Sequence, residues 1–180
     1  AEREVLAANS SELFTLALRP HLIFGPGDTN LLPTIIGRAK AGKLIRIGKG
    51  DNLVDVCFIE DCVSAHIAAM KALKDNPSSR GLAYFISQGE PVNLWNWIDQ
   101  ILVKNGLSPL KKGFSKRLAK LIAKASEVSS QIGLCKEPLL TQFLVSEMAT
   151  SHYFSIERAR KELNYTPEYT VAQALEITFA

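Results

Sequence analysis

Short unbroken apolar runs alternate with helical periods along the chain. Residues 13–18 (LFTLAL) are nearly all apolar, which is typical of a strand that is covered on both faces in a parallel sheet. Similar runs at 53–59 (LVDVCFI) and 82–87 (LAYFIS) predict two more strands, and residues 44–47 predict a short one. This alternation of strands and helices predicts a mixed α/β fold.

The helical segments are bounded by residues that suit helix ends. Residues 1–9 (AEREVLAAN) have the composition of the middle of a helix. A second helix is expected from Asn30, which can cap it, to Gly42, which stops it. Further helices are expected at four capping residues: Asp61, Asn93, Ser155 and Thr170. Each strand-like run therefore neighbours a helix, as in βαβ units.

The stretch LRPHLIFGPGD, residues 18–28, ends a strand-like run and opens into a loop with two glycines around Pro26. Glycine and proline interrupt regular structure, and loops at the ends of buried strands hold ligands in many α/β proteins. We therefore expect a ligand-binding loop here, with an ordinary connecting loop as the alternative. Asp28 and Asn30 follow it and are candidates for the rim of a substrate pocket, with local turn and capping bonds as an equal alternative.

Composition excludes several classes of protein. A length of 180 residues with 47% apolar residues fits one domain, or a domain with a smaller appendage. A net charge of +3 is too small to indicate a positive electrostatic field over the whole protein that would attract nucleic acid. The three cysteines and three histidines have no zinc-ligand spacing, so we expect no metal site and buried, reduced thiols. We expect a soluble, cytoplasmic protein, because no apolar run is long enough to cross a bilayer and residues 1–9 do not resemble a secretory leader.

Common catalytic motifs are missing from the sequence. No GxGxxG turn or phosphate-binding loop occurs, and no serine lies in a GxSxG elbow. No tyrosine is followed by a lysine four residues later. The sequence therefore predicts no catalytic residue within this chain. His66, which lies one turn into a predicted helix, is better explained by packing than by catalysis.

Four motifs resemble a known family in order and spacing: LRPHLIFGPGD, GKGDNLVDVCFIEDCVSAHIAAM, AYFISQGEPVNLWNWI and HYFSIERARKELNYTPEYT. They are similar to the C-terminal half of an extended short-chain dehydrogenase/reductase of the 3β-hydroxysteroid dehydrogenase/isomerase family, which includes sterol-4α-carboxylate 3-dehydrogenases. The resemblance implies the C-terminal part of a doubly wound NAD(P)-binding Rossmann fold with a smaller mixed α/β substrate-binding lobe. Residues 1–30 would end the nucleotide-binding domain. Residues 31–180 would be mostly the substrate lobe, with about 53–90 returning to the nucleotide-binding sheet.

The resemblance also implies which residues meet the ligands. Pro20, His21, Leu22 and Ile23 would contact the nicotinamide carboxamide and ring, mainly through backbone groups. A proline-stiffened loop suits this task, because its groups are fixed at little entropic cost. Val56 would contact the substrate together with the two rim candidates named above.

The implied activity is that of an NAD-dependent oxidoreductase, with NADP as an alternative cofactor. It would interconvert a secondary alcohol and a ketone on a hydrophobic substrate, such as a sterol or a long-chain keto acid. The family's Tyr-xxx-Lys pair would lie upstream of Ala1, so we expect the 180 residues alone to be inactive. A homodimer is implied only by analogy.

Three alternatives remain open. A reductase of long-chain 2-alkyl-3-keto acids needs a similar apolar pocket. A sugar-nucleotide epimerase or dehydratase is disfavoured, because Val54 precedes Asp55 where those enzymes carry a phosphate-binding arginine. A non-catalytic cofactor sensor would keep the fold and lose the catalytic pair. Asn164 replaces a glycine of the family pattern, and asparagine tolerates the same left-handed turn.

A basic amphipathic helix is predicted around Lys116 to Val128. An apolar stripe repeats along it, and its lysines and arginine occupy the other faces. One interpretation is a helix with solvated cations, and the other is peripheral contact with an anionic membrane surface.

Overall fold

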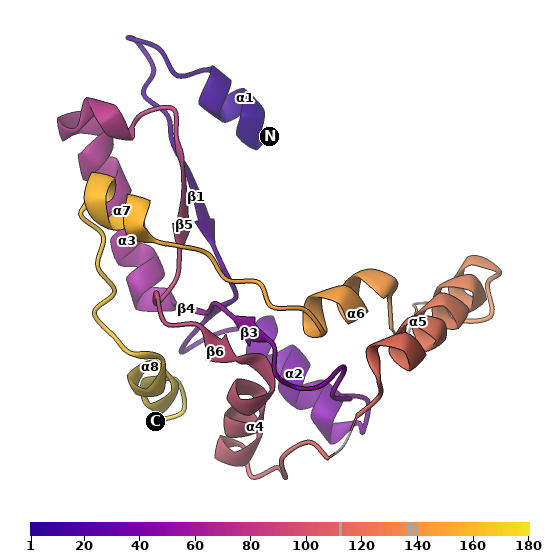
Figure 1. Ribbon diagram of the computed structural model, residues 1–180. Helices are drawn as coiled ribbons and strands as arrows, with labels where there is room; N and C mark the ends of the chain where they lie inside the picture. Colours follow the sequence, from indigo (N-terminus) through magenta and orange to yellow (C-terminus); the bar gives the residue numbers. More distant parts are fainter. Residues whose placement is uncertain (112, 137, 139) are drawn as a thin grey trace. The chain divides into compact units, whose positions relative to one another are not determined.

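The computed structural model describes residues 1–111, 113–136, 138 and 140–180. The chain forms two compact units, each assembled from separate segments (Figure 1). Unit 1 contains Ala1–Leu31, Asp55–Pro91 and Tyr153–Ala180, and unit 2 contains Leu32–Val54 and Val92–His152.

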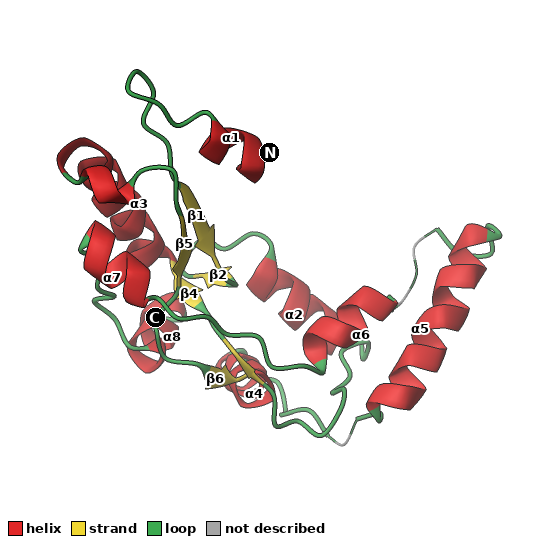
Figure 2. Cartoon of the chain, turned by 45° about the horizontal axis from the view of Figure 1, so that its top comes forward, coloured by secondary structure: helices red, strands yellow, loops and turns green. Residues whose placement is uncertain are grey.

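Unit 1 contains two short parallel strand pairs. β1 (Ala17–Pro20) pairs with β5 (Ala83–Ile86), and β2 (Ile23–Phe24) pairs with β4 (Cys57–Phe58). Two parallel strands need a crossover connection between them. The connection from β1 to β5 includes the long helix that lies between β4 and β5 in the sequence (Figure 2). The helices of this unit are α1 (Glu2–Ala7), α3 (Ile59–Asp75), η1 (Pro77–Ser79), α7 (Glu157–Leu163) and α8 (Val171–Thr178).

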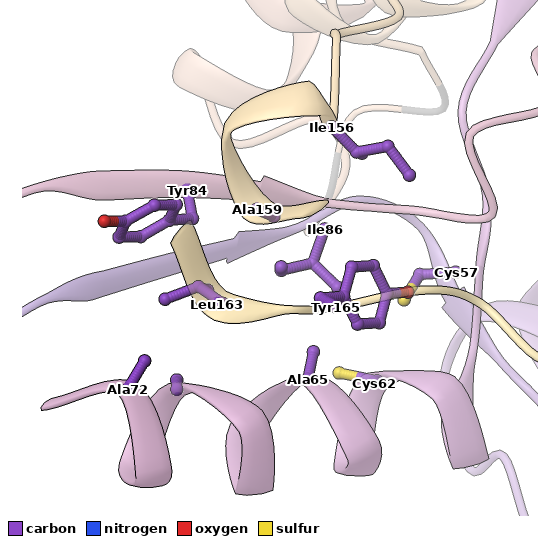
Figure 3. Close-up of a cluster of buried hydrophobic side chains, with 11 residues drawn as sticks. Cys57, Cys62, Ala65, Ala72, Tyr84, Ile86, Ile156, Ala159, Leu163 and Tyr165 are labelled. Carbon is purple, nitrogen blue, oxygen red and sulfur yellow. The ribbon is translucent and has the colours of Figure 1, made fainter. Parts of the chain in front are cut away.

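The core of unit 1 lies where α3 and α7 pack against β5 (Figure 3). α3 presents small side chains to it, namely Cys62, Ala65, Ala69 and Ala72. Their spacing of three to four residues puts them on one helix face. The larger side chains of Leu163 and Tyr165 fill the space above that face, and the Tyr165 hydroxyl donates to the Ser87 carbonyl at 3.1 Å.

Asn164 ends α7 in the left-handed conformation, with φ of 55°. The prediction that asparagine preserves this turn is confirmed. The turn matters for the core, because it separates Leu163 from Tyr165 and both are buried.

Unit 2 is mostly helical. β3 (Leu53–Val54) pairs antiparallel with β6 (Val92–Asn93). Its helices are α2 (Leu31–Lys40), whose first residue belongs to unit 1, α4 (Leu94–Lys104), α5 (Lys116–Gln131) and α6 (Gln142–Met148). α4 supplies much of the core through Trp95, Trp97, Ile98, Ile101 and Leu102.

Several predicted caps are confirmed. Asn93 accepts hydrogen bonds from the backbone N–H groups of Trp95 and Asn96. Thr170 and Gln173 form a reciprocal capping box at the start of α8. The second helix ends at Lys40 before Gly42, whose φ of +65° suits a helix stop.

The predicted strand at 13–18 is wrong in its first four residues. β1 begins at Ala17, and Leu13 and Phe14 are exposed. The reason is local, because the Ser10 hydroxyl accepts from the Leu13 N–H and the Asn9 side chain accepts from the Thr15 N–H. Such side-chain bonds hold the backbone in a loop. Residues of β1 are also only partly buried or exposed, not covered on both faces.

Two other strand predictions also need correction. Residues 53–59 form two separate strands, β3 and β4, in different units, and Ile59 already starts α3. Residues 44–47 form no strand in the structure; Ile47 makes a single bridge to Phe114. Both runs contain enough apolar residues to predict a strand. The number of apolar residues does not reveal where hydrogen bonding to a neighbouring strand ends.

The units can be compared with the predicted domains. The structure groups residues 153–180 with residues 1–31, because α7 packs on α3 and β5. The sequence placed 31–180 mostly in a substrate lobe. Which unit serves the cofactor and which the substrate stays a prediction.

The core of unit 1 makes a testable prediction through Leu163. Its side chain is 3% exposed, so Leu163→Ala should lower the free energy of unfolding by about 2–5 kcal/mol, the usual cost of such a cavity. Urea denaturation followed by circular dichroism measures this. Leu134→Ala is the matched control, because Leu134 is 76% exposed and its truncation should change stability by less than about 0.5 kcal/mol. Equal effects would contradict the assigned core.

Candidate functional site

A cleft of about 540 Å³ opens in unit 1 beside the loop that follows β2. Residues 20–31 without His21 form its walls, together with Ile59 from the start of α3. The volume falls in the usual range of small-molecule sites, roughly 300–1,000 Å³. The cleft lies beyond the carboxyl ends of β1 and β2, where parallel α/β sheets hold their ligands.

Leu22 and Gly25 set the path of the loop. Leu22 has φ of 42°, an uncommon conformation for a residue other than glycine, and its carbonyl accepts from the Cys57 N–H at 3.2 Å. Gly25 has φ of +157°, and a β-carbon there would overlap the Ile59 side chain. The loop therefore needs glycine at this position to approach α3.

Asp28 closes the loop onto α2. Its carboxylate accepts from the backbone N–H groups of Asn30 at 2.7 Å and Leu31 at 3.0 Å. The Asp28 N–H in turn donates to the Gly25 carbonyl at 3.2 Å. Asp28 thus has the local turn role that the sequence left open, and Asn30 is exposed at the rim. Contact of either residue with a substrate stays a prediction.

The structure brings most of the predicted cofactor residues together. Pro20, Leu22 and Ile23 line the cleft. His21 does not; its N–H donates to the Ile86 carbonyl, and its ring packs edge-on against Phe154 with centroids 5.8 Å apart. A contact between the His21 backbone and the cofactor stays a prediction.

Val56, the predicted substrate residue, is fully buried in unit 1 and is not part of the cleft wall. Its carbonyl accepts from the Gln88 N–H at 3.0 Å. A direct substrate contact by Val56 stays a prediction.

Asp61 and Gln88 form a buried polar network behind the cleft. The predicted N-cap role of Asp61 is wrong: α3 starts after Phe58, and the Asp61 carboxylate is 1% exposed. It accepts hydrogen bonds from the Gln88 side-chain amide and from the Glu168 N–H at 2.8 Å. The Gln88 side-chain oxygen Oε1 accepts from the Phe58 N–H at 2.7 Å, and the side-chain Nε2 also donates to the Tyr169 carbonyl at 3.1 Å. The network therefore fixes the junction of β4 and α3.

This junction supports the cleft. The Phe58 ring lies 3.3 Å from the point where a Gly25 β-carbon would be, and it packs against the Phe24 ring with centroids 5.9 Å apart. Sequence reasoning missed Gln88, which stands in a turn motif with no periodic signal. The position of Gln88 between a predicted strand and Gly89 did not indicate that its side chain is buried.

An aromatic cluster lies near the end of β1 and was also missed. The rings of Phe85 and Phe154 stack with centroids 4.0 Å apart, and the Arg19 guanidinium lies 5.1 Å from the Phe85 centroid. Arg19 also pairs with Glu2 of α1. The Asp55 carboxylate accepts from the Phe154 N–H at 2.7 Å and so fixes this segment.

Two thiols interact where β4 leads into α3: Cys57 lies in β4 and Cys62 in the first turn of α3. A hydrogen bond with Cys57, and then the His66 ring, lower the pKa of Cys62 to about 7, although burial acts in the opposite direction. The same hydrogen bond and burial raise the pKa of Cys57 above its usual range. His66 is exposed rather than packed in the core, and its Nδ1 lies 2.7 Å from the Cys62 carbonyl oxygen.

The described part of the chain contains no cluster of three side chains that could hold a metal ion. None of its helices combines the length and apolar character that a membrane crossing requires.

The sequence matches a family model and curated proteins. Residues 1–115 match the model of the 3-beta hydroxysteroid dehydrogenase/isomerase family. The chain is 39% identical over 176 residues to 2-alkyl-3-oxoalkanoate reductase of Stenotrophomonas maltophilia, covering 97% of this chain and 53% of that protein. It is 36% identical over 184 residues to the decarboxylating sterol-4-alpha-carboxylate 3-dehydrogenase of Mus musculus, covering 98% and 51%. The chain spans about half the length of these relatives.

Solved structures share the fold. dTDP-glucose 4,6-dehydratase from Bacillus anthracis in complex with NAD aligns with a TM-score of 0.58 at 19% identity, over 98% of this chain and 47% of that one. UDP-glucuronic acid 4-epimerase from Bacillus cereus in complex with NAD aligns with a TM-score of 0.55 at 17% identity, over 91% and 43%. The predicted fold class is confirmed.

The close contact of Gly25 with α3 can be tested by a mutant cycle. Gly25→Ala should lower the free energy of unfolding by about 1–3 kcal/mol, because the new methyl group overlaps Ile59. In an Ile59→Ala background the same change should cost less, so the double mutant is more stable than the sum of the single effects predicts. Urea denaturation gives all four values.

Gly37→Ala is the matched control for this cycle. Gly37 lies within α2, and a β-carbon there has no atom within 4 Å. This change should raise stability by about 0.5–1 kcal/mol, as alanine does in helix interiors. Strict additivity of Gly25→Ala and Ile59→Ala would show that the two residues do not touch.

Proposed function

Because the chain belongs to the 3-beta hydroxysteroid dehydrogenase/isomerase family, we propose that it forms part of an NAD-dependent oxidoreductase that interconverts a secondary alcohol and a ketone. The observation that carries this proposal is the cleft at the carboxyl ends of β1 and β2, walled by Pro20, Leu22 and Ile23. Its volume and largely apolar wall suit the flat nicotinamide ring.

The cofactor would supply the hydride acceptor or donor. This chain's own contribution is to hold and orient it. The left-handed Leu22 and the close-packed Gly25 fix the loop before any ligand arrives, so little conformational entropy is lost on binding. Ile23 is exposed beside the cleft and would cover one part of the ring and exclude water.

The substrate class follows from what the relatives' names share. A 2-alkyl-3-oxoalkanoate and a sterol-4α-carboxylate oxidised at carbon 3 both carry oxygen on the carbon adjacent to the one that bears the carboxylate. We therefore propose a hydrophobic β-hydroxy or β-keto carboxylate as substrate. The higher identity to the reductase favours a long-chain keto acid, with a sterol acid as the second candidate. Val54, in place of a phosphate-binding arginine, disfavours a sugar nucleotide.

The location of the protein is also a proposal. We place it in the cytoplasm at the surface of a membrane, with α5 as the contact. The apolar stripe of this helix is exposed at Leu118 by 44%, Leu121 by 66% and Val128 by 46%, and Ile132, directly after the helix, is exposed by 65%. The packed face is formed by Ala119 and Ala123, and α5 contacts α6. A homodimer is proposed only by analogy with the family.

The charge on α5 supports an anionic membrane. Its cations are Lys116, Arg117, Lys120 and Lys124, and they all lie within the first nine of its 16 residues. Cations beside an exposed apolar stripe are typical of helices that lie in the membrane interface. Each cation near an anionic surface contributes about 1 kcal/mol.

The cofactor proposal is tested on the protein that contains this chain, by NADH fluorescence and by turnover of 2-alkyl-3-oxoalkanoates. Ile23→Glu should raise the Kd for the cofactor by roughly tenfold, because it places a carboxylate where an apolar contact is needed. Val63→Glu is the matched control, since Val63 is equally apolar and exposed on α3 but outside the cleft; it should leave the Kd within about twofold. Thermal stabilisation by a UDP-sugar without keto-acid turnover would contradict the proposal.

The membrane proposal is tested by co-sedimentation with vesicles. Anionic vesicles should bind the protein more tightly than neutral ones, and Leu121→Glu should weaken binding to anionic vesicles by roughly tenfold. Met70→Glu changes an equally exposed apolar residue in unit 1 and should have little effect. Equal binding to anionic and neutral vesicles would refute the contact.

A further inference from the structure

The face of α3 that points away from the core of unit 1 carries exposed apolar side chains. Figure 3 shows Ala65 and Ala72 on the other face, where they point toward the core. Val63 is 52% exposed, Ile67 46% and Met70 67%. Because a helix has about 3.6 residues per turn, Ile67 lies nearly opposite Ala65. The outer face of α3 is therefore apolar at its centre.

These three residues belong to a regular row of five exposed positions, which we name the α3 stripe: Glu60, Val63, Ile67, Met70 and Lys74. The steps between them are three, four, three and four residues. This is the spacing at which helices contact each other in coiled coils. Single exposed apolar residues are ordinary on a protein surface, but here three follow one another in one stripe. The spacing favours contact with another helix.

The two ends of the α3 stripe have opposite charges. Glu60 lies in the first turn of α3, and Lys74 lies in the last turn, near the exposed Lys71. Glu60 also accepts a hydrogen bond from the Tyr169 hydroxyl and remains exposed. Two copies of this helix side by side in the antiparallel direction bring each acidic end to a basic end, whereas the parallel direction brings like charges together. The stripe is therefore complementary to itself in the antiparallel direction.

A twofold axis at Ile67 produces this arrangement. In a twofold interface the same surface of both copies takes part, and each contact occurs twice. Glu60 and Lys74 each lie seven residues from Ile67, roughly 10 Å along the helix, so each meets the other in the second copy. Val63 and Met70 lie on one side of the stripe, four residues before the axis and three after it, so they pack together across the interface. Ile67 packs against Ile67 of the second copy.

We propose that the α3 stripe binds the α3 stripe of a second copy of this chain in the antiparallel direction. The proposal stands on unit 1 and does not require the oxidoreductase function, and none of the five stripe residues lines the cleft. It commits to a second copy rather than to an anionic membrane, because such a surface repels the acidic end of the stripe. One helix pair is a small interface, so the dimer should be weak, with a Kd of roughly tens to hundreds of micromolar.

Sedimentation velocity over a concentration series measures self-association of the protein that contains this chain. Ile67→Glu places two carboxylates against each other at the axis and should raise the Kd of the dimer by roughly a hundredfold. Val103→Glu is the matched control, because Val103 is 56% exposed on α4 of unit 2; it should leave the Kd within about twofold. Thermal melting checks that both variants remain folded.

Charge reversal tests the antiparallel pairing. Glu60→Lys and Lys74→Glu each produce a dimer in which like charges meet at both ends, so each variant alone should associate roughly tenfold more weakly. An equimolar mixture of the two variants should associate like the unchanged protein, because each end of the mixed dimer again meets the opposite charge. These differences should shrink in about 1 M NaCl, where charges are screened beyond roughly 3 Å. A dimer formed through another surface would not respond in this way.

Three results would each overturn the proposal: sedimentation that does not change with concentration, equal association of Ile67→Glu and Val103→Glu, or a mixture of the charge variants that associates no more tightly than either alone. Vesicle binding that Ile67→Glu abolishes, without self-association, would identify a membrane surface instead. Keto-acid turnover without self-association would refute this interface and leave the proposed function intact. Self-association through the stripe without turnover would do the opposite.

Discussion

The buried bonds between Asp61 and Gln88 are the interaction on which the candidate site depends. A buried carboxylate is costly unless its oxygens are satisfied, and here they accept from the Gln88 amide and from the Glu168 backbone. The same glutamine accepts from the Phe58 N–H, so three segments meet at two side chains. Phe58 then lies behind Gly25, and the cleft takes its shape from that contact.

Local signals in the sequence predicted local structure well. The caps at Asn93 and Thr170 and the turn at Asn164 follow from residue types whose bonds reach only a few positions. The role of Asp61 could not be predicted in this way, because its partners are 27 and 107 residues distant. The capping rule considers only neighbouring residues, and it therefore predicted a hydrogen bond from Asp61 to the start of its own helix. The loop at Gly25 was predicted from its glycines and proline, but its partner Ile59 comes from another segment.

The basic helix shows another limit of sequence patterns. The periodicity of α5 predicted an apolar stripe, and the stripe exists. Periodicity does not say which face is covered, and here the small residues Ala119 and Ala123 are packed while Leu121 is exposed. Small side chains allow close packing against a neighbouring helix, so the larger apolar residues remain exposed.

The order in which the segments leave the ribosome gives the Asp61 network a further consequence. Unit 2 is complete once residue 152 has been synthesised, but unit 1 still lacks α7, Tyr165 and the Glu168 N–H. Until then the nascent chain holds an acidic side chain and an apolar face of α3 without their final partners. Unit 1 is therefore completed after unit 2, although it also contains residues 1–31, which precede unit 2 in the chain, and chaperones would meet it in this unfinished state.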